Sequence, residues 1–398
     1  MQYKTKKRLK TFLLAAAAVL ALTFVVVAFG AWRMFGTFIT AAKSIRKLKD
    51  GVYVMEYRGD YGFDDFLAQG GADSDSAMAD YLVGFLSRGY YKKADNDIRP
   101  GDYGCSTVCV KDENGAVYFG RNFDWKKGRA MIVHTVPDHG YESLSTCGLD
   151  FLGFGDDYEP DGSMQERIQT LAAIYVPLDG MNEKGLIVAD LMAGDKEETH
   201  QKTDKPDLTT TTAIRLLLDR AANVDEAVEL LKQYDMNSSI GAAHHFAVAD
   251  ATGKSVVVEY VDGEMLVTET NIVTNHYLAD CPKKGVGSKE SHQRFDWLLN
   301  CIGPDFVLLG SRGRPGSNRI YSPPYKEVLT LLGPLSVSQS KYFQRTDGDC
   351  EVTLWSIVYA SWKHWADFYY SEDFDHGCRL RLREEKDFVS DTPRIFYD

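Results

Sequence analysis

Several patterns that assign a chain quickly to a class are missing from this sequence. Its 398 residues contain seven cysteines and no Cys-x-x-Cys pair, which argues against a zinc ribbon and a thioredoxin-like redox site. It has no internal repeat and no low-complexity tract. The 57 Asp and Glu residues outnumber the 45 Lys and Arg residues, giving a formal net charge of −12. Because no basic stripe interleaved with aromatic residues is present, we expect no nucleic-acid partner.

Metal and cofactor patterns are missing as well. His244-His245 is the nearest approach to a metal pair, but adjacent residues of a strand point to opposite faces, so we expect no metal and no cofactor. The cysteines are too sparse for a disulfide framework, and their odd number leaves at least one free thiol. One or two disulfides are compatible with an extracytoplasmic domain. The cysteines lie at positions 105, 109, 147, 281, 301, 350 and 378.

The N-terminus departs from the acidic composition. Residues 1–10 carry five basic side chains, and residues 11–32 form an uncharged, mostly apolar run of 22 residues. A helix of that length reaches about 33 Å, enough to cross the hydrocarbon core of a bilayer. We therefore predict a transmembrane signal anchor at 11–32, a basic cytoplasmic end at 1–10, and the remainder of the chain on the extracytoplasmic side.

Two other interpretations of this segment stay open. Ala28-Phe29-Gly30 resembles a signal-peptide cleavage site, so secretion by signal-peptide cleavage is an alternative to a retained membrane anchor. A buried soluble helix is the other alternative, which the length of the run and its basic flank disfavour. Further basic residues between Arg33 and Lys49 weaken the charge asymmetry from which the orientation is inferred.

The remaining chain divides near position 104. Residues 33–104 combine a helical pattern around Ala77–Leu86 with loops rich in Gly and Asp, and they end in the turn-rich sequence IRPGDYG. Exposed turns are where chains are cut, so we interpret 33–104 as a pro-segment or linker. From residue 105 to residue 398, strand patterns, then helical patterns, then further strand patterns predict one α+β domain with packed sheets and helices outside.

The sequence CSTVCVKDENGAVYFGRNFDW, residues 105–125, is the part most informative about chemistry. Asn114-Gly115 is a two-residue hairpin signal, because both residue types tolerate positive φ. Pairing back from that turn places Cys105 opposite Asp124, whereas a four-residue loop places it opposite Asn122. Either register brings Cys105 beside the segment from Arg121 to Asp124. Those two residues are three apart and point to opposite faces of an ideal strand, so if both contact Cys105 the strand must end or bulge between them.

A cysteine in this setting suits nucleophilic chemistry. A thiol attacks as its thiolate, which a nearby cation such as Arg121 stabilises. No histidine lies close in the sequence to serve as base. Cleavage between Gly104 and Cys105 would instead give Cys105 its own α-amine, with a reference pKa near 8, which acts as a base at neutral pH. Asp124 would orient that amine. The alternative is a surface hairpin with a buried structural cysteine.

The same stretch resembles the start of the choloylglycine hydrolase family, which includes penicillin V acylase and bile salt hydrolase. The resemblance continues, in family order, at 179–191 (DGMNEKGLIVADL), 273–276 (VTNH), 291–295 (SHQRF) and 353–360 (TLWSIVYA). It implies an N-terminal nucleophile hydrolase with an αββα four-layer fold, which cleaves a linear acyl-amide C–N bond of a small-molecule substrate. Residues 1–104 have no counterpart in the cytosolic bacterial members.

The resemblance also implies roles for six residues. Cys105 is the nucleophile, Arg121 and Asp124 position and activate it, and Arg294 matches an active-site arginine. Asn182 and Asn275 match asparagines near the nucleophile and are candidates for oxyanion contacts. Without the family, Asn182 reads as a turn residue and Arg294 as part of a surface ion pair. Cys109 reads as a buried core thiol.

We therefore expect a membrane-anchored, extracytoplasmic amidase that is made as a precursor, with 105–398 as the amidase domain. Two alternatives belong to other functional classes. One is acyl transfer to an amine acceptor in place of water. The other is an uncleaved, inactive surface binding protein of the same fold. The sequence fixes neither the amide substrate nor the oligomeric state.

Overall fold

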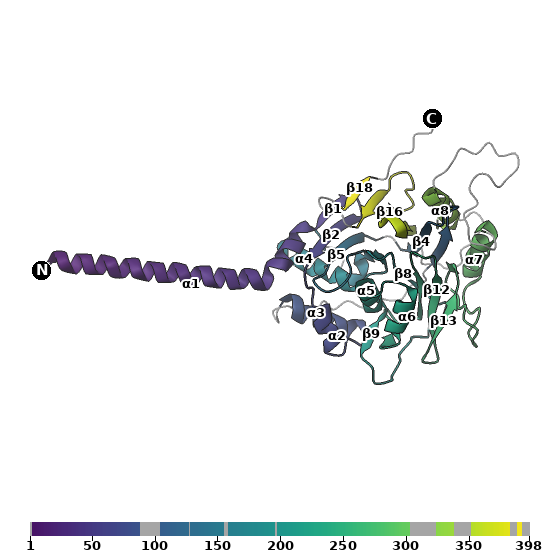
Figure 1. Ribbon diagram of the computed structural model, residues 1–398, viewed down its shortest axis with the longest axis horizontal. Coiled ribbons are helices and arrows are strands. Elements are labelled where there is room, and N and C mark those ends of the chain that lie inside the picture. The colour runs from purple at the N-terminus through teal and green to yellow at the C-terminus, as the bar shows by residue number, and fades with distance from the viewer. Residues whose placement is uncertain are drawn as a thin grey trace, which may run out of the picture.

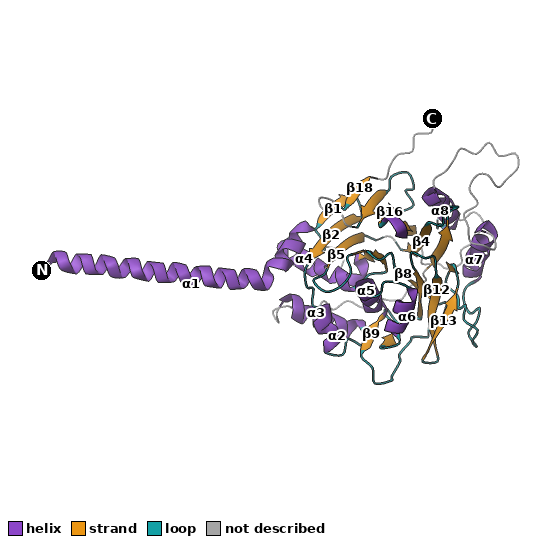
Figure 2. Ribbon diagram, viewed as in Figure 1, coloured by secondary structure: helices purple, strands orange, loops and turns teal. Residues whose placement is uncertain are grey.

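Two β-sheets lie face to face, and helices cover the outer face of each sheet (Figure 1 and Figure 2). The structure is a computed structural model. It describes residues 2–87, 104–126, 128–154, 158–195, 197–302, 324–337, 352–382 and 388–391.

The first sheet has nine strands in the order β1-β2-β5-β6-β7-β8-β11-β12-β13. Neighbouring strands are antiparallel, except that β2 and β5 are parallel. The strands are β1 (Arg46–Lys49), β2 (Val52–Arg58), β5 (Ala130–Val136), β6 (Ser143–Gly148), β7 (Asp179–Asn182), β8 (Ile187–Met192), β11 (His244–Ala249), β12 (Ser255–Val261) and β13 (Glu264–Glu269).

The second sheet has seven strands in the order β14-β3-β4-β15-β16-β17-β18, and all of its pairs are antiparallel. Its strands are β3 (Gly104–Lys111), β4 (Val117–Trp125), β14 (Ile272–Val273), β15 (Val352–Ala360), β16 (Trp365–Tyr370), β17 (Cys378–Arg381) and β18 (Val389–Asp391). The short strands β9 (Asp207–Thr209) and β10 (Asp235–Asn237) form a separate parallel pair.

The helices form the two outer layers. They are α1 (Gln2–Ser44), α2 (Phe63–Ala68), α3 (Asp75–Ser87), α4 (Met164–Thr170), α5 (Thr210–Arg220), α6 (Val224–Leu231), α7 (Lys289–Ile302) and α8 (Pro324–Leu332). Short 3-10 helices are η1 (Leu149–Leu152), η2 (Leu171–Tyr175), η3 (Gly333–Leu335) and η4 (Ser361–Lys363).

Side chains alternate between the layers, as the period of a strand requires. In β2, Met55 packs into the cluster shared with the helices, whereas Val54 packs into the cluster between the two sheets. On the other side, Val358 of β15 packs against Leu298 of α7 and Val328 of α8. The layer order is therefore helix, sheet, sheet, helix, which confirms the predicted αββα arrangement of an α+β domain.

The hairpin between β3 and β4 has a register that neither sequence-based alternative gave. Cys105 pairs with Phe123, and Gly104 pairs with Asp124. The cause is a three-residue loop: Gly115 takes φ +80°, its N–H donates to Asp112 O at 3.0 Å, and Asp112 N–H donates to Ala116 O at 2.9 Å. Such a loop is a turn followed by one residue in the left-handed region, and it shifts the pairing by one residue relative to a two-residue turn.

Local helix signals were more reliable. Asn223 was predicted as an N-cap, and its Oδ1 accepts from Glu226 N–H at 3.0 Å at the start of α6. The predicted helical piece around Ala77–Leu86 lies within α3. These elements depend on neighbouring residues alone, which the sequence displays directly.

The segment 33–87 is built into the domain rather than lying apart from it. All seven residues of β2 pair with β5, from Val52–Ala130 to Arg58–Val136. Phe38 and Ala41 of α1 and Phe66 of α2 belong to the core cluster beneath the first sheet. Residues 33–87 therefore share the first sheet and its core with the rest of the domain, and the pro-segment at 33–104 stays a prediction. The end of the predicted pro-segment, at 88–103, lies outside the described residues.

Helix α1 projects from the body over much of its length (Figure 1). Large apolar side chains on it are exposed, including Leu20, Phe24 and Phe29. Within the residues that the structure describes, no helix meets the combined requirements of length and apolar character for crossing a membrane. The transmembrane anchor predicted at 11–32 is thus not supported.

Candidate active site

Cys105 lies near the start of β3, in the cluster between the two sheets, and is 2% exposed. Its backbone N–H donates to Asn275 Oδ1 at 2.7 Å. Its backbone carbonyl accepts from Arg294 Nη1. The backbone N–H and the backbone carbonyl of Cys105 are therefore both hydrogen-bonded by residues more than 150 positions away in the chain.

Arg121 reaches Cys105 from the neighbouring strand β4. Its side chain is fully buried between the sheets, and its Nη2 lies 4.0 Å from Cys105 Sγ. The same Nη2 donates to Asp190 O at 2.6 Å, and Nη1 donates to Leu178 O and to the carboxylate of Asp179. A cation fixed at this distance stabilises a thiolate.

With the Gly104–Cys105 bond intact, the thiol is nevertheless a weak acid. Burial raises the pKa of Cys105 to about 11, although Arg121 acts in the opposite direction. Desolvation disfavours the charged form of any acid, and here it outweighs the guanidinium. Burial therefore favours the protonated thiol of Cys105 at neutral pH.

Asp124 lies on the other face of β4 from Arg121, so the strand-parity argument was correct. Its Cα pairs with that of Gly104 rather than Cys105. Its Oδ1 accepts from Thr353 Oγ1 of β15 at 2.6 Å, where the β4–β15 register shifts between Thr353 and Trp355. Asp124 thus stands beside the peptide bond whose cleavage was predicted.

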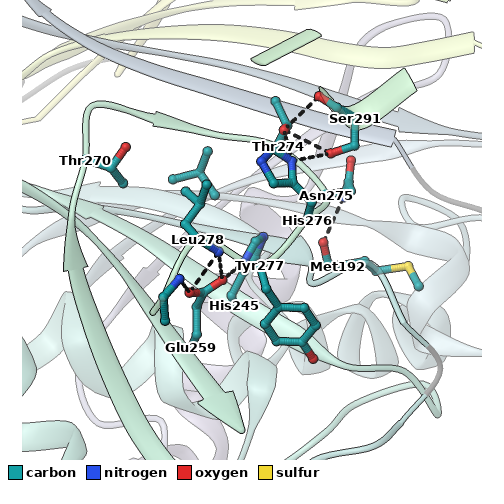
Figure 3. A network of polar contacts seen from close by, with 12 residues as sticks. Met192, His245, Glu259, Thr270, Thr274, Asn275, His276, Tyr277, Leu278 and Ser291 are labelled. Carbon is teal, nitrogen blue, oxygen red and sulfur yellow. Dashed lines mark hydrogen bonds and ion pairs between the residues drawn. The ribbon is translucent and has the colours of Figure 1, made fainter. Parts of the chain in front are cut away.

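Asn275 and Arg294 complete the arrangement around Cys105. Asn275 Oδ1 accepts from Arg294 Nη2 at 2.9 Å as well as from Cys105 N. Its Nδ2 donates to Met192 O at 3.0 Å (Figure 3). Arg294 is 1% exposed and donates also to Ser106 Oγ at 2.8 Å. The alternative of a surface ion pair for Arg294 is therefore wrong.

Asn182 does not join this group, which corrects its assignment as an oxyanion contact. Both of its amide hydrogens point to helix carbonyls, with Nδ2 at 3.0 Å from Leu218 O and 2.8 Å from Ala221 O. Its Oδ1 accepts from the N–H groups of Lys184 and Leu186. An amide whose donors are engaged at the end of α5 has none left for an oxyanion, so Asn182 is a turn and helix-end residue.

Asp179 is the site residue that sequence reasoning missed. Its carboxylate is fully buried. It accepts from Arg121 Nη1, from Thr146 Oγ1 at 2.6 Å, from Trp355 Nε1 at 3.0 Å and from the hydroxyl of Tyr359. It therefore supplies the counter-charge that holds Arg121 between the sheets. A signal was available, because Asp179 opens the same DGMN motif from which Asn182 was chosen.

The segment that carries Asn275 is fixed from two sides (Figure 3). Glu259 of β12 is fully buried and accepts from the N–H groups of Leu278 and Ala279 and from His245 Nδ1. On the other side, the residues Thr274, His276 and Ser291 form a group of hydrogen bonds with distances of 2.9 to 3.1 Å.

Cysteines and histidines outside this centre are buried or contact carboxylates. Cys109 is buried between the sheets, as predicted, and burial raises its pKa to about 12. Free cysteines in the described part of the chain include Cys105, Cys109, Cys147, Cys281 and Cys378. His244 and His245 contact different carboxylates. No group of three or more metal-ligating side chains is found among the residues that the structure describes.

Comparison with known proteins agrees with the motifs. Residues 105–277 match the model of the linear amide C-N hydrolases, choloylglycine hydrolase family. Penicillin V acylase of Pectobacterium atrosepticum is 33% identical over 100 residues, covering 22% of this chain and 26% of that protein. Bile salt hydrolase/transferase of Clostridium perfringens is 27% identical over 188 residues, covering 42% of this chain and 51% of that protein. The matches span about half or less of these relatives.

Solved structures resemble the chain at low sequence identity. A variant of conjugated bile acid hydrolase from Clostridium perfringens aligns with a TM-score of 0.49 and 15% identity, over 73% of this chain and 97% of that one. Penicillin V acylase from Agrobacterium tumefaciens aligns with a TM-score of 0.44 and 18% identity, over 67% of this chain and 83% of that one. Residues 105–277, rather less than half of the chain, therefore resemble the choloylglycine hydrolase family of linear amide C–N hydrolases.

Proposed function

We propose that this chain is the precursor of an amidase whose nucleophile is Cys105, exposed as an N-terminal residue by cleavage of the Gly104–Cys105 peptide bond. The observation that carries the proposal is the environment of Cys105. Its nitrogen lies 2.7 Å from Asn275 Oδ1, and its sulfur lies 4.0 Å from Arg121 Nη2. An acceptor at the nitrogen and a cation at the sulfur are what an amine base and a thiolate nucleophile require.

The reaction then proceeds in two halves. The α-amine of Cys105 takes the thiol proton, and the sulfur attacks the carbonyl carbon of an acyl amide to form a tetrahedral intermediate. Its C–N bond breaks as the ammonium returns the proton to the leaving nitrogen, which departs as an amine. Water, deprotonated by the same α-amine, attacks the thioester and releases the acyl group as a carboxylic acid. Asn275 accepts from the amine throughout, and of the two predicted oxyanion asparagines it is the one adjacent to Cys105.

Cleavage supplies both the base and the reactivity. A peptide nitrogen has no basic lone pair, whereas an α-amine has a reference pKa near 8. In the intact chain the pKa of Cys105 is about 11, because the sulfur is buried. We propose that the uncleaved chain is inactive for both reasons.

After cleavage, residues 33–87 are proposed to remain bound as a second chain. Strand β2 lies between β1 and β5 in the nine-stranded sheet, and Val52, Met55 and Tyr57 have no exposed surface. Each such side chain contributes about 2 kcal/mol of burial energy. The processed enzyme is expected to purify as a complex of two polypeptides and to lose activity when they are separated by denaturant.

The proposed substrate class is supported by two relatives, which are named for penicillin V and for bile salts. We propose an acyl amide and leave its acyl group open. One relative is named a hydrolase/transferase, which favours acyl transfer to an amine as the second candidate function. In that case an added amine would intercept the thioester in competition with water. Acid and amide products, measured together by mass spectrometry at increasing amine concentration, distinguish the two outcomes.

The extracytoplasmic location stays a separate proposal. It is supported by the basic residues 1–10 and by the exposed apolar side chains of α1. Protease treatment of intact cells tests it, since an external domain is digested and an internal one is protected.

The processing proposal is tested by intact-mass measurement and N-terminal sequencing of the expressed protein. The expected result is a polypeptide that begins at Cys105 and hydrolyses a panel of acyl amides. Cys105→Ala is expected to abolish turnover, and Cys109→Ala, at the neighbouring buried thiol, is expected to retain it. A Cys105→Ala protein that stays full-length would further indicate that Cys105 performs the cleavage. A chain that never acquires this N-terminus contradicts the mechanism and favours the binding-protein alternative.

A further inference from the structure

A buried charge pair lies on the helix-facing side of the nine-stranded sheet, on β8 and β11. The backbone of β8 also accepts a hydrogen bond from Arg121. Asp190 of β8 and His244 of β11 are each 6% exposed, and His244 Nδ1 lies 2.8 Å from Asp190 Oδ1. Val188 and Phe246, which have the same strand parity, pack in the cluster under the helices. The pair is therefore separated from Cys105 by the backbone of the sheet.

The surroundings of His244 settle its charge. Its second ring nitrogen, Nε2, lies 3.0 Å from Ser239 O. A carboxylate and a carbonyl oxygen are both acceptors, so with Asp190 ionised both ring nitrogens donate, and the ring is then an imidazolium. Burial alone would lower the pKa of His244, but Asp190 raises it above the ordinary value, with smaller contributions from Ser239 and Asp75.

Asp190 connects this pair to the nucleophile. Its backbone carbonyl accepts from Arg121 Nη2 at 2.6 Å, and the same nitrogen lies 4.0 Å from Cys105 Sγ. The negative charge of Asp190 acts to raise the pKa of the Cys105 thiol. A cation at His244 offsets that charge, which leaves Arg121, opposed by Asp124, as the main charge that acts on the thiolate.

The N-terminal segment completes the connection. Asp75, the first residue of α3, accepts from Ser239 Oγ at 2.8 Å and from Ile240 N–H at 2.9 Å. Ile240 has φ +48°, a conformation that is strained for a β-branched residue. Asp75 therefore stabilises an unfavourable turn, and that turn presents the Ser239 carbonyl to His244. The groups facing His244 are thus Asp190 from β8, Asp75 from α3 and the Ser239 carbonyl.

We propose that His244 is a positioning residue whose imidazolium form balances Asp190 behind the Arg121–Cys105 centre, and that Asp75 of the segment before the proposed cleavage site holds it in place. The proposal deepens the proposed function and rests on it, since it concerns the thiol assigned there as the nucleophile. In this proposal, the N-terminal segment contributes to the charge balance around Cys105 as well as to the fold.

The test compares His244→Gln, Asp190→Asn and the double variant in the processed protein. The pKa of Cys105 is obtained from the pH dependence of its alkylation by iodoacetamide, read on the Cys105 peptide by mass spectrometry. His244→Gln leaves Asp190 uncompensated, so the thiol pKa and the acidic limb of the pH–rate profile are expected to rise. Alkylation at pH 7 is expected to fall about three- to tenfold. The double variant removes both charges and is expected to return both values close to the parent.

Two outcomes overturn the proposal. One is an unchanged thiol pKa in His244→Gln, and the other is a double variant that behaves like the single one. Alkylation needs no substrate, so it gives an answer even if the chain hydrolyses no amide, and the failure of the proposed function is seen separately as an absence of turnover.

A second variant pair covers the case in which His244→Gln does not fold. Asp75→Asn is expected to shift the thiol pKa in the same direction by a smaller amount, because the Ser239 turn loosens. Asp73→Asn changes an exposed carboxylate two residues upstream and is expected to leave the profile unchanged. Equal effects of the two substitutions, or none from Asp75→Asn, contradict the role given to Asp75.

Discussion

Replacement of Asn182 by Ala separates a structural role from a catalytic one. The variant loses two hydrogen bonds to the carbonyls of Leu218 and Ala221 at the end of α5 and two from the N–H groups of Lys184 and Leu186. A buried hydrogen bond contributes about 1 kcal/mol, and a group left unsatisfied costs more. We therefore expect a loss of about 4 kcal/mol, which is a large part of the stability of an ordinary domain.

The assay is urea unfolding beside steady-state kinetics at a temperature where the variant stays folded. The expected result is a lowered unfolding midpoint and a kcat, per folded molecule, within a few-fold of the parent. Asn114→Ala, at the exposed tip of the β3–β4 hairpin, is the matched control and should change stability by less than about 0.5 kcal/mol. Parental stability combined with a hundredfold or greater loss of kcat would refute the structural assignment and restore the oxyanion one.

Two further predictions concern buried titratable groups. Asp179→Asn removes the counter-charge of Arg121, so we expect about 3–5 kcal/mol of destabilisation together with a large loss of turnover; parental values in urea unfolding and kinetics would contradict that role. Burial, aided by His292, lowers the pKa of His276 from 6.5 to about 4. The folded protein therefore favours the neutral ring. The contribution of that ring to the free energy of unfolding is fully present above pH 6.5 and is lost as the pH falls from 6.5 through about 4. The loss is at most about 3 kcal/mol, and His276→Gln should flatten the corresponding part of the curve of unfolding free energy against pH; a curve with the parental slope would count against it.

The sequence predicted the elements whose signals are local. The strands on either side of Asn114-Gly115 and the cap at Asn223 depend on a few neighbouring residues, and they formed as expected. The register of the hairpin did not, because a two-residue and a three-residue loop share the same Asn-Gly signal. They differ only in whether Asp112 hydrogen-bonds Ala116 across the loop, and that one residue decides whether Cys105 faces Asp124 or Phe123.

The position of residues 33–87 in the first sheet could not be predicted from neighbouring residues in the sequence. Strand β2 is buried on both faces, with Val54 toward one core and Met55 toward the other, so it shows no alternation of apolar and polar residues. Its principal partner, β5, begins 78 positions after Val52 and runs parallel to it. A parallel pair needs a long connection, and nothing near Val52 in the sequence identifies that partner.

From the DGMN motif, Asn182 was predicted as a site residue and Asp179 was not, and strand parity explains why the structure differs. Asp179 and Met181 point between the sheets, where Arg121 lies, whereas Asn182 points to the helices. Residues three apart cannot share a face of a regular strand. Arg121 and Asp124 of β4 obey the same parity, and in β7 parity places Asp179, not Asn182, on the face that Arg121 occupies.

The residues around Cys105 are already in place in the intact chain, before the proposed cleavage. Asn275, Arg294 and Arg121 already surround Cys105 while its nitrogen is still part of a peptide bond. The atoms that would serve the free amine therefore need no rearrangement, since Asn275 Oδ1 accepts equally from a peptide N–H and from an ammonium. In the proposed mechanism, cleavage changes only the chemistry: the nitrogen gains a basic lone pair and the sulfur gains an adjacent base. The N-terminal segment pairs with the nine-stranded sheet, and Asp75 holds the turn that contacts His244. Loss of this segment is therefore expected to disrupt the centre that cleavage is proposed to activate. Processing without release is the arrangement that satisfies both conditions.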